Sequence, residues 1–539
     1  MSIGYFGPQH FDTRQAMIDY MLPLLEHRVL AIDVETISLT DRRPIGLSIA
    51  PSATEAFYIT VYPELDQDFP IHILQNPQIR KVFHNSLFDL GALQDCERSN
   101  FDDTMIMANL LCLPAKLSDL SLMLDTGNEV HEMKEYLKKG MTTLDLTVNQ
   151  VGTKCCQDST ATFAIWEQLK DRVDQEYYNV ELALVPILLE MSKRGLRIDH
   201  EKRLEFLAKY EQDIEYYRDV CTDAGMMNPN SPLQVGHILA KRGNLLPIYR
   251  RKNKRSGKWE HKIKTSKEYL GELTDPLAVA IVAYKHATKM KSTYLDPLEG
   301  LDRAFTRFHT DAATGRISST DRNLQNVAED LRGMFVPDGK VFTAWDASQI
   351  ELRCLAYLSN DSEMIKIFET GGDIHQETAN FLGIDRKIAK NTIFSIIYGA
   401  GDKRAAFTAK IQSTQRIREL KEAWFGRFSG AAKWIAQQIE QASEDGYVYT
   451  LYGRKLMMPV NERDPSDVVR KAVDYPCQGS AAEIIKRIMI KCQWLPMVLQ
   501  VHDELIADGD VEDEVRELKL EDVAPFKVPF NIKIMSRWE

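Results

Sequence analysis

The feature that most constrains the fold is an apolar, β-prone run that ends in a carboxylate and is followed at once by a helical pattern. Residues 341–353 read VFTAWDASQIELR, so Asp346 falls where the strand should end. A carboxylate at a strand end is held rigidly and still faces a cleft, as a catalytic metal ion requires. Taken alone, Asp346 is better interpreted as the N-cap of the next helix. The metal-site interpretation therefore depends on partners elsewhere in the chain.

A second pair of acids lies far down the chain. Residues 497–507 read MVLQVHDELIA and predict a strand, a tight turn and a second strand, with Asp503 and Glu504 at the turn. The apolar flanks would press both acids towards a core, which a solvated hairpin tip does not explain. Carboxylates on neighbouring strands can hold two divalent cations about 4 Å apart, the arrangement that clamps both oxygens in phosphoryl transfer. Glu504 is expected to be secondary and to tune the site.

A helical stripe of cations and aromatics lies between these segments. One face carries, at intervals of four residues, Arg386, Lys390, Phe394 and Tyr398. The stripe spans roughly 18 Å at 1.5 Å per residue. Asp385 is the expected N-cap and Gly399 the expected end of the helix. Such a face can hold a triphosphate at one end and a base at the other, although an amphipathic core helix with solvated cations has the same periodicity.

A different set of acids lies in the N-terminal third. Residues 29–36 read VLAIDVET and predict a strand with Asp33 and Glu35 on one face, because residues i and i+2 of a strand share a face. Alone, such a pair is common on solvated strands. Asp89 in HNSLFD and Asp158 in DSTAT add weight, because four converging carboxylates could hold two metal ions that hydrolyse a phosphodiester.

Taken in order, these segments resemble motifs of a known family. DASQIELR (346–353), RKIAKNTIFSIIYG (386–399) and QVHDEL (500–505) resemble motifs A, B and C of family A DNA polymerases, the bacterial DNA polymerase I group. Further blocks are TGRISSTDRNLQN (314–326), GDIHQETA (372–379), TLYGR (450–454) and QGSAAE (478–483). The four N-terminal acids resemble exonuclease motifs I, II and III of the DEDD proofreading domain. The resemblance covers essentially the whole chain.

The resemblance implies an α/β and α+β multidomain fold. An RNase H-like DEDD exonuclease domain is followed by a right-hand polymerase with palm, fingers and thumb. The expected bounds are 1–180 for the exonuclease, 181–302 for the thumb, 303–365 and 446–539 for the two parts of the palm, and 366–445 for the fingers. Residues 249–267 are dense in Lys and Arg and match the thumb tip, where contact with the DNA backbone is expected. Pro186 is expected to mark a bend or a turn.

The resemblance also implies the reaction. Template-directed addition of deoxynucleotides to a primer 3′-hydroxyl is expected, with 3′–5′ proofreading, in DNA replication. Two Mg²⁺ ions per site are expected, with Mn²⁺ as a substitute. Their ligands would be Asp346, Asp503 and the carbonyl of Ala347 in the polymerase site, and Asp33, Glu35, Asp89 and Asp158 in the exonuclease site. Lys390 is the expected proton donor to the leaving group.

Substrate-binding residues follow from the same motifs. The expected nucleotide-binding residues are Gln349, Glu351, His375, Arg386, Lys390, Phe394 and Tyr398. The expected DNA contacts, mostly in the minor groove, are Lys291, Ser292, Arg316, Asn323, Gln325, Arg454, Gln478 and His502. The minor groove offers acceptors common to all base pairs, so polar side chains there can sense pair geometry without reading sequence. Glu351 matches the steric gate whose bulk blocks a ribose 2′-hydroxyl.

Two positions depart from the family pattern. The third exonuclease motif usually has Tyr, or in some relatives His, four residues before its Asp, whereas Lys154 stands four residues before Asp158. The residue that orients the attacking water is thus replaced, and we expect an attenuated exonuclease in which Lys154 swings to solvent or pairs with a ligand carboxylate. Asp474 stands where the family usually has Asn, and it would repel DNA unless Arg470 or Lys471 neutralises it.

Other readings of the chain remain open. They are a 3′–5′ exonuclease with an inactive polymerase half, a single-subunit RNA polymerase, and a noncatalytic DNA-binding factor. Glu351 argues against the RNA polymerase, which needs room for the 2′-hydroxyl. The intact acids and cations of the three polymerase motifs argue against an inactive half. The net charge of −11 argues mildly against nucleic-acid binding, but this count is global whereas DNA senses local charge.

Location and partners are expected by the same reasoning. The chain has neither a basic-then-apolar N-terminal signal nor an apolar run able to span a bilayer, so a cytoplasmic protein without a membrane partner is expected. Primer-template DNA and dNTPs are the expected ligands of a monomer, and a helicase or a single-strand binding protein are candidate replisome partners. The stretch before the exonuclease is too short for the 5′ nuclease of full-length bacterial polymerase I. That feature is typical of phage enzymes, so a phage origin and a bacterial host cytoplasm are expected.

Overall fold

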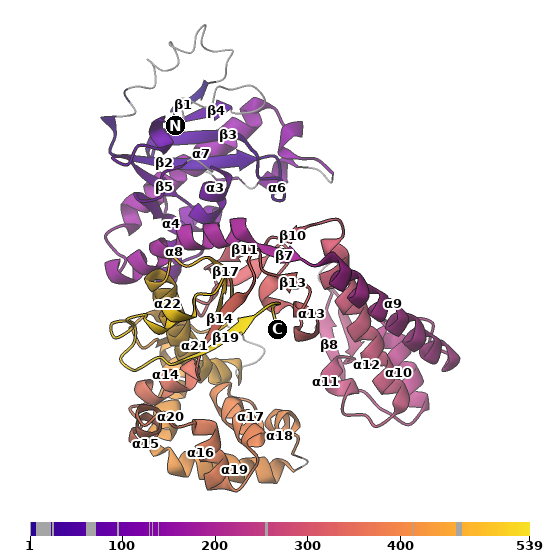
Figure 1. Ribbon diagram of the computed structural model, residues 1–539. Coiled ribbons are helices and arrows are strands. Elements are labelled where there is room, and N and C mark those ends of the chain that lie inside the picture. The colour runs from indigo at the N-terminus through magenta and orange to yellow at the C-terminus, as the bar shows by residue number, and fades with distance from the viewer. Residues whose placement is uncertain are drawn as a thin grey trace.

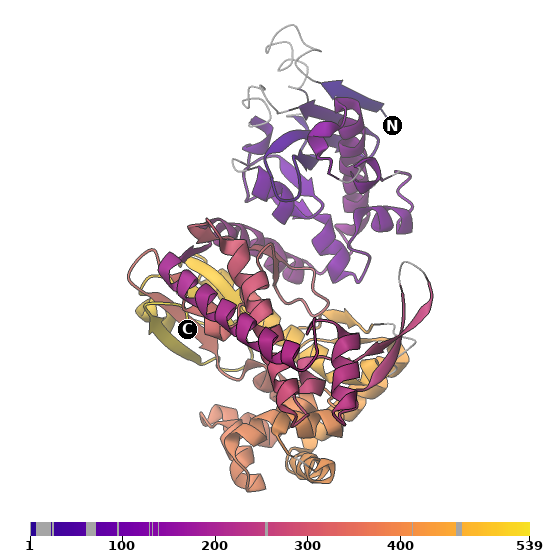
Figure 2. The same ribbon diagram turned by 90° about the vertical axis from the view of Figure 1, so that its right-hand side faces the viewer.

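The computed structural model of the chain describes residues 2–6, 23, 26–60, 72–93, 96–128, 130–131, 133–137, 140–253, 257–411, 413–459 and 466–539. An N-terminal α/β domain stands on a larger C-terminal part, from which two helical lobes project in different directions (Figures 1 and 2). This layout agrees with the predicted α/β and α+β multidomain class. Among the described residues, no helix is both long and apolar enough to cross a membrane.

The N-terminal domain is a six-stranded mixed sheet covered by helices. The strand order is β1 (Ser2–Phe6), β4 (Glu55–Thr60), β3 (Pro44–Ser52), β2 (Val29–Thr36), β5 (Arg80–Phe83) and β6 (Phe101–Asp103). β3 runs antiparallel to β2 and β4, and β5 and β6 continue parallel to β2. The surrounding helices are α3 (Ser86–Ala92), α4 (Thr104–Leu110), α5 (Leu117–Met123), α6 (Met133–Tyr136) and α7 (Val148–Leu169). The predicted strand with Asp33 and Glu35 is therefore β2, inside the sheet.

Helix α7 fixes the position of the third exonuclease motif. It begins with a capping box, in which Gln150 N donates to Thr147 Oγ1 at 3.2 Å and Thr147 N donates to Gln150 Oε1 at 3.0 Å. The helix then packs across β2, β3 and β4. Cys155 and Ile165 are fully buried in this contact. Because residues four apart share a helix face, Lys154 and Asp158 face the sheet together.

Helix α8 (Gln175–Arg194) joins the two parts of the chain. Asp174 caps its start by accepting hydrogen bonds from the next backbone N–H groups, and Gly195, with φ of 56°, ends it. The helix continues through Pro186, so the predicted start of a turn there is wrong. The free energy gained by burying both sides of the helix exceeds the cost of the backbone hydrogen bond that Pro186 cannot donate.

The two sides of α8 belong to different cores. Val185 and Leu189 pack into the core of the N-terminal domain. Leu184 and Leu188 pack into the core of the C-terminal part. The bound predicted at residue 180 lies inside this shared helix, and the bound at 365 lies inside another helix, α15 (Ser362–Glu369). All the domain bounds stay predictions.

The C-terminal part is built on a four-stranded antiparallel sheet. Its strand order is β17 (Met497–Val501), β18 (Glu504–Asp508), β14 (Phe342–Ala347) and β19 (Phe530–Met535). Helices α14 (Ile350–Leu358) and α21 (Ser466–Lys491) pack on each other beside it. Trp345, Ile484 and Leu499 lie in its core. Smaller elements are β7 (Leu196–Ile198), β10 (Arg303–Ala304), β11 (Arg307–His309), β12 (Ser318–Thr320), β13 (Phe335–Val336), α13 (Glu329–Arg332) and α22 (Glu512–Arg516).

Two lobes extend from this sheet. The predicted thumb contains α9 (His200–Asp223), α10 (Pro232–Lys241), α11 (Lys267–Leu270), α12 (Pro276–Lys289) and the exposed hairpin β8 (Ile248–Lys252) and β9 (Trp259–Ile263). Residues 249–263 of the basic segment 249–267 thus belong to the hairpin, apart from 254–256, which lie outside the described residues, and Lys267 begins α11. The predicted fingers contain α15, α16 (Ile374–Leu382), α17 (Arg386–Ile397), α18 (Asp402–Ala409), α19 (Thr414–Arg427) and α20 (Ser429–Asp445), followed by β15 (Tyr447–Tyr449) and β16 (Lys455–Met457).

Candidate active sites

Three acids of motifs A and C meet at one edge of the palm sheet. Asp346 is the penultimate residue of β14, and its partner in the register with β18 is Glu504. The turn between β17 and β18 lies against the same strand end, because Ala347 N donates to the carbonyl oxygen of Asp503 at 3.0 Å. Gln349 is the N-cap of α14, so the simple interpretation of Asp346 as a cap is wrong.

Strained backbone turns lie next to both candidate aspartates. Gln349, three residues after Asp346, has φ of 54°, and His502, just before Asp503, also has φ of 54°. Residues other than glycine adopt this left-handed region at a cost on the order of 1–3 kcal/mol, and such residues cluster at functional sites. The turns therefore fix the direction of the two acids at the expense of local stability.

Burial and neighbouring acids disfavour the charged form of the palm acids. Burial raises the pKa of Asp503 to about 7, and Glu351 and Asp346 add to the shift. Burial also raises the pKa of Asp346, although Lys533 and Lys390 oppose that shift. Clustered carboxylate oxygens are the donors that hard divalent cations prefer. The donor set of Asp346 and Asp503 therefore fits a magnesium-type ion.

A chain of amides supports the turn that carries Asp503. Gln325 is buried and donates to Gln500 Oε1 at 2.7 Å, and Gln500 Nε2 donates to the carbonyl oxygen of His502. These contacts give Gln325 a positioning role towards the turn, and its predicted contact with DNA stays a prediction. Gln500 is a further supporting residue that motif spacing did not single out. Its signal was a single polar side chain in an otherwise apolar strand, residues 497–501.

Helix α17 carries the predicted stripe. Asp385 caps the helix by accepting from Lys387 N at 2.7 Å, and Gly399, with φ of 56°, follows its end. The rings of Phe394 and Tyr398 stack with centroids 5.7 Å apart and an interplanar angle of 11°. Arg386, Lys390 and Tyr398 are exposed, whereas Ile393 and Ile397 bury the opposite face. The stripe is therefore available to a ligand from solvent.

His375 lies beside the aromatic half of the stripe. Its side chain is buried, and its ring centroid is 5.8 Å from that of Phe394. Burial lowers the pKa of His375 to about 4, so the imidazole is neutral near pH 7. A neutral imidazole can donate a hydrogen bond but supplies no charge, and its contact with a triphosphate stays a prediction. Asp373, at the start of the same helix, forms an ion pair with Arg386 at 2.6 Å.

Glu351 joins motif A to the minor-groove candidates. It is buried, forms an ion pair with Arg316 at 2.5 Å and accepts a hydrogen bond from Tyr398 Oη at 2.9 Å. Burial raises the pKa of Asp474 to about 6, with Glu351 adding to the shift and Arg316 opposing it. Gln478 Nε2 donates to Asp474 Oδ1 at 3.4 Å. Asp474 therefore belongs to the cluster around the steric gate.

The expected neutralisation of Asp474 takes a different form. Arg470 and Lys471 both form ion pairs with Asp467, each at 3.2 Å. They stand three and four residues after Asp467 on α21, so their shortest ion pairs are local ones. Arg316 lowers the pKa of Asp474 more than Lys471 does. Arg316 therefore acts on Asp474 together with the predicted Lys471, and neutralisation of Asp474 beside DNA stays a prediction.

Other expected DNA contacts are engaged within the protein. Arg454 is buried and donates to Glu181 Oε1 at 3.0 Å, and its contact with DNA stays a prediction. Lys291 pairs with Asp296 at 2.8 Å and with Glu211 at 3.3 Å. Intraprotein contacts also involve Ser292 Oγ, which donates to Thr288 O, and Asn323 Oδ1, which accepts from Ser319 Oγ.

The N-terminal domain brings its four candidate acids together. Asp33 and Glu35 come from β2, Asp89 from α3 and Asp158 from α7. Asp89 Oδ1 accepts a hydrogen bond from Val34 N at 3.1 Å, which joins the helix to the strand between the first two acids. Burial raises the pKa of Asp33 to about 8, with Asp158 and Glu35 adding to the shift. Burial raises the pKa of Asp89 well above its usual range.

Lys154 lies inside this acidic cluster. Its ammonium is 2.7 Å from Glu35 Oε1 and 2.6 Å from Asp158 Oδ2. Burial lowers its pKa, but Asp158 and Glu35 outweigh burial and hold the pKa well above its usual value. Of the two positions expected for Lys154, the structure has the one paired with ligand carboxylates. The acids are a donor set suited to metal ions, but two of them already have a cation.

Cys155 is a further group beside these acids. It offers a sulfur close to Asp33 and Glu35, with the ligand atoms of all three residues within 4.8 Å of one another. Burial raises the pKa of its thiol well above the usual range. With the Lys154 ammonium against Glu35 and Asp158, the site as it stands does not fit two metal ions.

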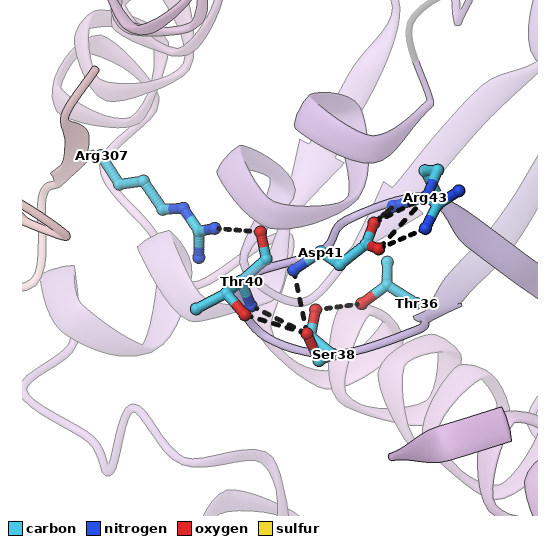
Figure 3. Close-up of polar contacts among 6 residues, drawn as sticks. All are labelled: Thr36, Ser38, Thr40, Asp41, Arg43 and Arg307. Carbon is cyan, nitrogen blue, oxygen red and sulfur yellow. Dashed lines mark hydrogen bonds and ion pairs between the residues drawn. The ribbon is translucent and has the colours of Figure 1, made fainter. Parts of the chain in front are cut away.

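The loop after Glu35 connects this site to the palm. Asp41 N donates to Ser38 Oγ at 2.9 Å and Thr36 Oγ1 donates to Ser38 O at 3.1 Å, which folds the loop back on itself (Figure 3). Arg307 of β11 donates to the carbonyl oxygens of Leu39 and Thr40. A cavity of about 600 Å³ adjoins this contact, lined among others by Arg42, Phe88, Lys193, Arg307, His309 and Arg322. The lining also includes Asp321, which pairs with Arg307 at 2.8 Å.

Comparison with known families agrees with this geometry. Residues 201–536 match the family described as DNA polymerase family A, and the chain belongs to that family. Residues 8–174 match the family described as 3'-5' exonuclease. The chain thus combines a family A polymerase domain with a 3′–5′ exonuclease domain, two kinds of domain that generally depend on divalent metal ions.

Its relatives include bacterial enzymes. DNA polymerase I of Chloroflexus aurantiacus is 32% identical over 93% of this chain and 59% of the relative. DNA polymerase I of Pseudomonas aeruginosa is 29% identical over 95% of this chain and 62% of the relative. The chain therefore spans about 60% of the length of these relatives. A solved structure described as the POL domain of Pol1 from M. smegmatis, in complex with DNA primer-template and dNTP, has the same fold. Its TM-score is 0.80 at 23% identity, covering 100% of this chain and 99% of that one.

Proposed function

We propose that this chain is a DNA-directed DNA polymerase that extends a primer 3′-hydroxyl with dNTPs on a DNA template. The observation that supports this most directly is the meeting of Asp346 with the turn that carries Asp503, beside β18 and its Glu504. Family membership and the exposed stripe of α17 support the same proposal. Primer-template DNA and dNTPs are the proposed ligands of this chain.

Asp346 and Asp503 would hold two Mg²⁺ ions, with the carbonyl of Ala347 as a proposed further ligand. When bound, these ions lower the pKa of the primer hydroxyl and neutralise the triphosphate and pyrophosphate charge. Glu504 stays a secondary acid in this proposal. It faces Asp346 across the strands, but the proposed metal ligands are Asp346 and Asp503. Positioning and charge stabilisation supply most of the rate in such reactions.

The side chains of α17 would bind and orient the nucleotide. Arg386 and Lys390 offer cations to the phosphates, and Lys390 is the proposed proton donor to the leaving group. Phe394 and Tyr398 present stacked rings to the sugar and base. Glu351 would exclude ribonucleotides by bulk, and its bonds to Arg316 and Tyr398 hold its carboxylate in one place.

A second proposed activity is 3′–5′ hydrolysis of single-stranded DNA, at a reduced rate. The convergence of Asp33, Glu35, Asp89 and Asp158 favours it, together with the match of residues 8–174. Lys154 favours the reduction, because it holds two of the four acids. A role in replication, a cytoplasmic location, a monomeric state, a phage origin and replisome partners such as a helicase remain predictions.

A primer-extension assay with Mg²⁺ tests the main proposal. Asp346→Ala and Asp503→Ala should each reduce extension on the order of a thousandfold, since losing one preorganised charge-stabilising group costs about 10²–10³. Binding of primer-template should remain close to that of the unaltered chain. Asp522→Ala is a matched control, because the Asp522 side chain is 67% exposed and pairs with the surface residue Lys491 at 2.7 Å. Appreciable extension by either palm variant, or a preference for ribonucleotides, would refute the proposal.

A further inference from the structure

We propose that the Lys154 ammonium takes the place of a divalent cation in the exonuclease site, so that a metal ion enters between Glu35 and Asp158 only when Lys154 is displaced. The proposal rests on the proposed function, because these acids belong to the proposed exonuclease site. Lys154 then acts as an internal counter-ion: it keeps the acids together without metal and competes with metal for them.

The contacts of Lys154 are those of a bound cation. Its Nζ atom lies 2.7 Å from Glu35 Oε1 and 2.6 Å from Asp158 Oδ2, so it bridges a strand and a helix. Only 12% of the Lys154 side chain is exposed, against 10% for Glu35 and 9% for Asp158. A lysine at a solvated surface gains little from one ion pair. Here the ammonium is enclosed by the acids that a metal would use.

The backbone around Lys154 is fastened to the sheet on both sides. Ser48 Oγ of β3 donates to the carbonyl oxygen of Cys155 at 2.7 Å. Cys155 Sγ donates to the carbonyl oxygen of Asp33 on β2 at 3.4 Å. Because Lys154 precedes Cys155 and shares a helix face with Asp158, its side chain is directed to Glu35 by the packing of α7. The packing of α7 on the sheet therefore fixes the position of the Lys154 side chain.

Lys154 and a metal ion cannot both occupy this position. A divalent cation binds carboxylate oxygens at roughly 2.0–2.6 Å, and the oxygens that it would need are already in contact with the ammonium. Two cations on the same oxygens would repel strongly in a buried site. Asp33 Oδ2 is also buried, and among the described residues it accepts no hydrogen bond. Removal of Lys154 should therefore leave an acidic cluster with a strong demand for a cation.

Titration of the full chain with Mn²⁺ alone tests the proposal. The proteins are the unaltered chain, Lys154→Met, which keeps the length of the side chain without its charge, and Lys116→Met as a matched control. Lys116 forms an exposed ion pair with Asp119 at 3.8 Å in the same domain. Bound Mn²⁺ is measured by electron paramagnetic resonance, and the melting temperature is measured in EDTA and in Mn²⁺. The polymerase acids are present in all three proteins, so differences between them report the exonuclease site.

Lys154→Met should bind additional Mn²⁺ with an affinity roughly tenfold or more above that of the same site in the unaltered chain. Its melting temperature should fall in EDTA and recover in Mn²⁺ by more than that of the control. Identical Mn²⁺ titrations of Lys154→Met and the unaltered chain would overturn the proposal. If Lys154→Met does not fold, Lys154→Gln, which can still donate to one carboxylate, is tested against the same two outcomes.

Primer extension measured in parallel keeps the two proposals distinguishable. All three proteins should extend a primer equally in saturating Mg²⁺, because Lys154 lies outside the palm. Loss of extension in all three would count against the proposed polymerase, while the Mn²⁺ difference would still decide the role of Lys154.

Discussion

The buried ion-pair network between α8 and α21 offers a sharp test of what holds the two halves together. Glu181 of α8 is 5% exposed and contacts Lys486 Nζ at 2.6 and 2.8 Å and Arg454 Nη1 at 3.0 Å. Lys486 is 1% exposed and Arg454 7% exposed. Burial lowers the pKa of Lys486, and Glu181 opposes that shift. Glu181→Ala would therefore leave two buried cations without their shared partner.

The expected loss is about 3 kcal/mol of unfolding free energy. Removing one partner of a buried ion pair typically costs about 3–5 kcal/mol. We expect the lower end of this energy range because Glu483 lies in the same network. Burial raises the pKa of Glu483 to about 7, and Glu181 contributes to that shift. Without Glu181, Glu483 should ionise more completely and offset part of the loss.

Urea unfolding followed by tryptophan fluorescence measures the effect, since Trp345 and Trp538 lie in the palm core. Glu176→Ala is the matched control on the same two helices. Its carboxylate is 75% exposed and pairs with Arg487 at 2.9 Å, and exposed pairs contribute only about 0–1 kcal/mol. The double variant Glu181→Leu/Lys486→Met should recover part of the loss, because the unpaired lysine charge is removed while the buried Arg454 still lacks Glu181 and keeps only the nearby Glu483. Equal shifts for Glu181→Ala and Glu176→Ala would refute the reasoning.

Four further predictions, made for three positions, concern the two sites. In single-nucleotide competition, Glu351→Ala should raise ribonucleotide incorporation relative to deoxynucleotide incorporation by roughly 10- to 100-fold. Glu351→Gln, which keeps the bulk of the side chain, should not raise this ratio. An unchanged ratio in both variants would place the steric gate at another residue. Asp474→Asn should tighten primer-template binding at low salt, where repulsion is less screened; equal affinity across a salt titration would show that this acid does not face the duplex. The same variant should be more stable above about pH 6, with the gain fading towards pH 4. The folded pKa of about 6 exceeds the ordinary pKa of an aspartate, 3.8, so the unfolded chain ionises first and Asp474 costs stability as pH rises between these values. A gain independent of pH in thermal melts would contradict that sign. Lys154→Tyr should raise the rate of single-strand digestion without changing primer extension, and an unchanged digestion rate would contradict the attenuation.

Local spacing was enough to predict much of both sites. The stripe on α17 follows from intervals of four residues, and its cap and end follow from Asp385 and Gly399. The strand with Asp346 and the hairpin with Asp503 follow from apolar runs interrupted by acids. Each of these features is decided by neighbours in the sequence, where periodicity and turn preferences act.

Long-range partners could not be read from the sequence in the same way. Arg454 matches a DNA-contacting motif, but its partner Glu181 stands on a helix of the other half of the chain. Gln325 was expected to face DNA, yet it supports the turn of motif C through Gln500. Lys154 could be placed on the face of Asp158, whereas its contact with Glu35 depends on how α7 packs across β2. Such pairings are set by tertiary packing alone.

The shared helix α8 limits how the two halves of the chain can move relative to each other. Val185 and Leu189 are part of one core and Leu184 and Leu188 are part of the other, so turning one half against the other would pull apart side chains that both cores need. Under the proposed function, the polymerase and exonuclease sites are therefore expected to keep a constant separation. A mispaired primer end would then have to unwind and cross the gap between the two sites by itself.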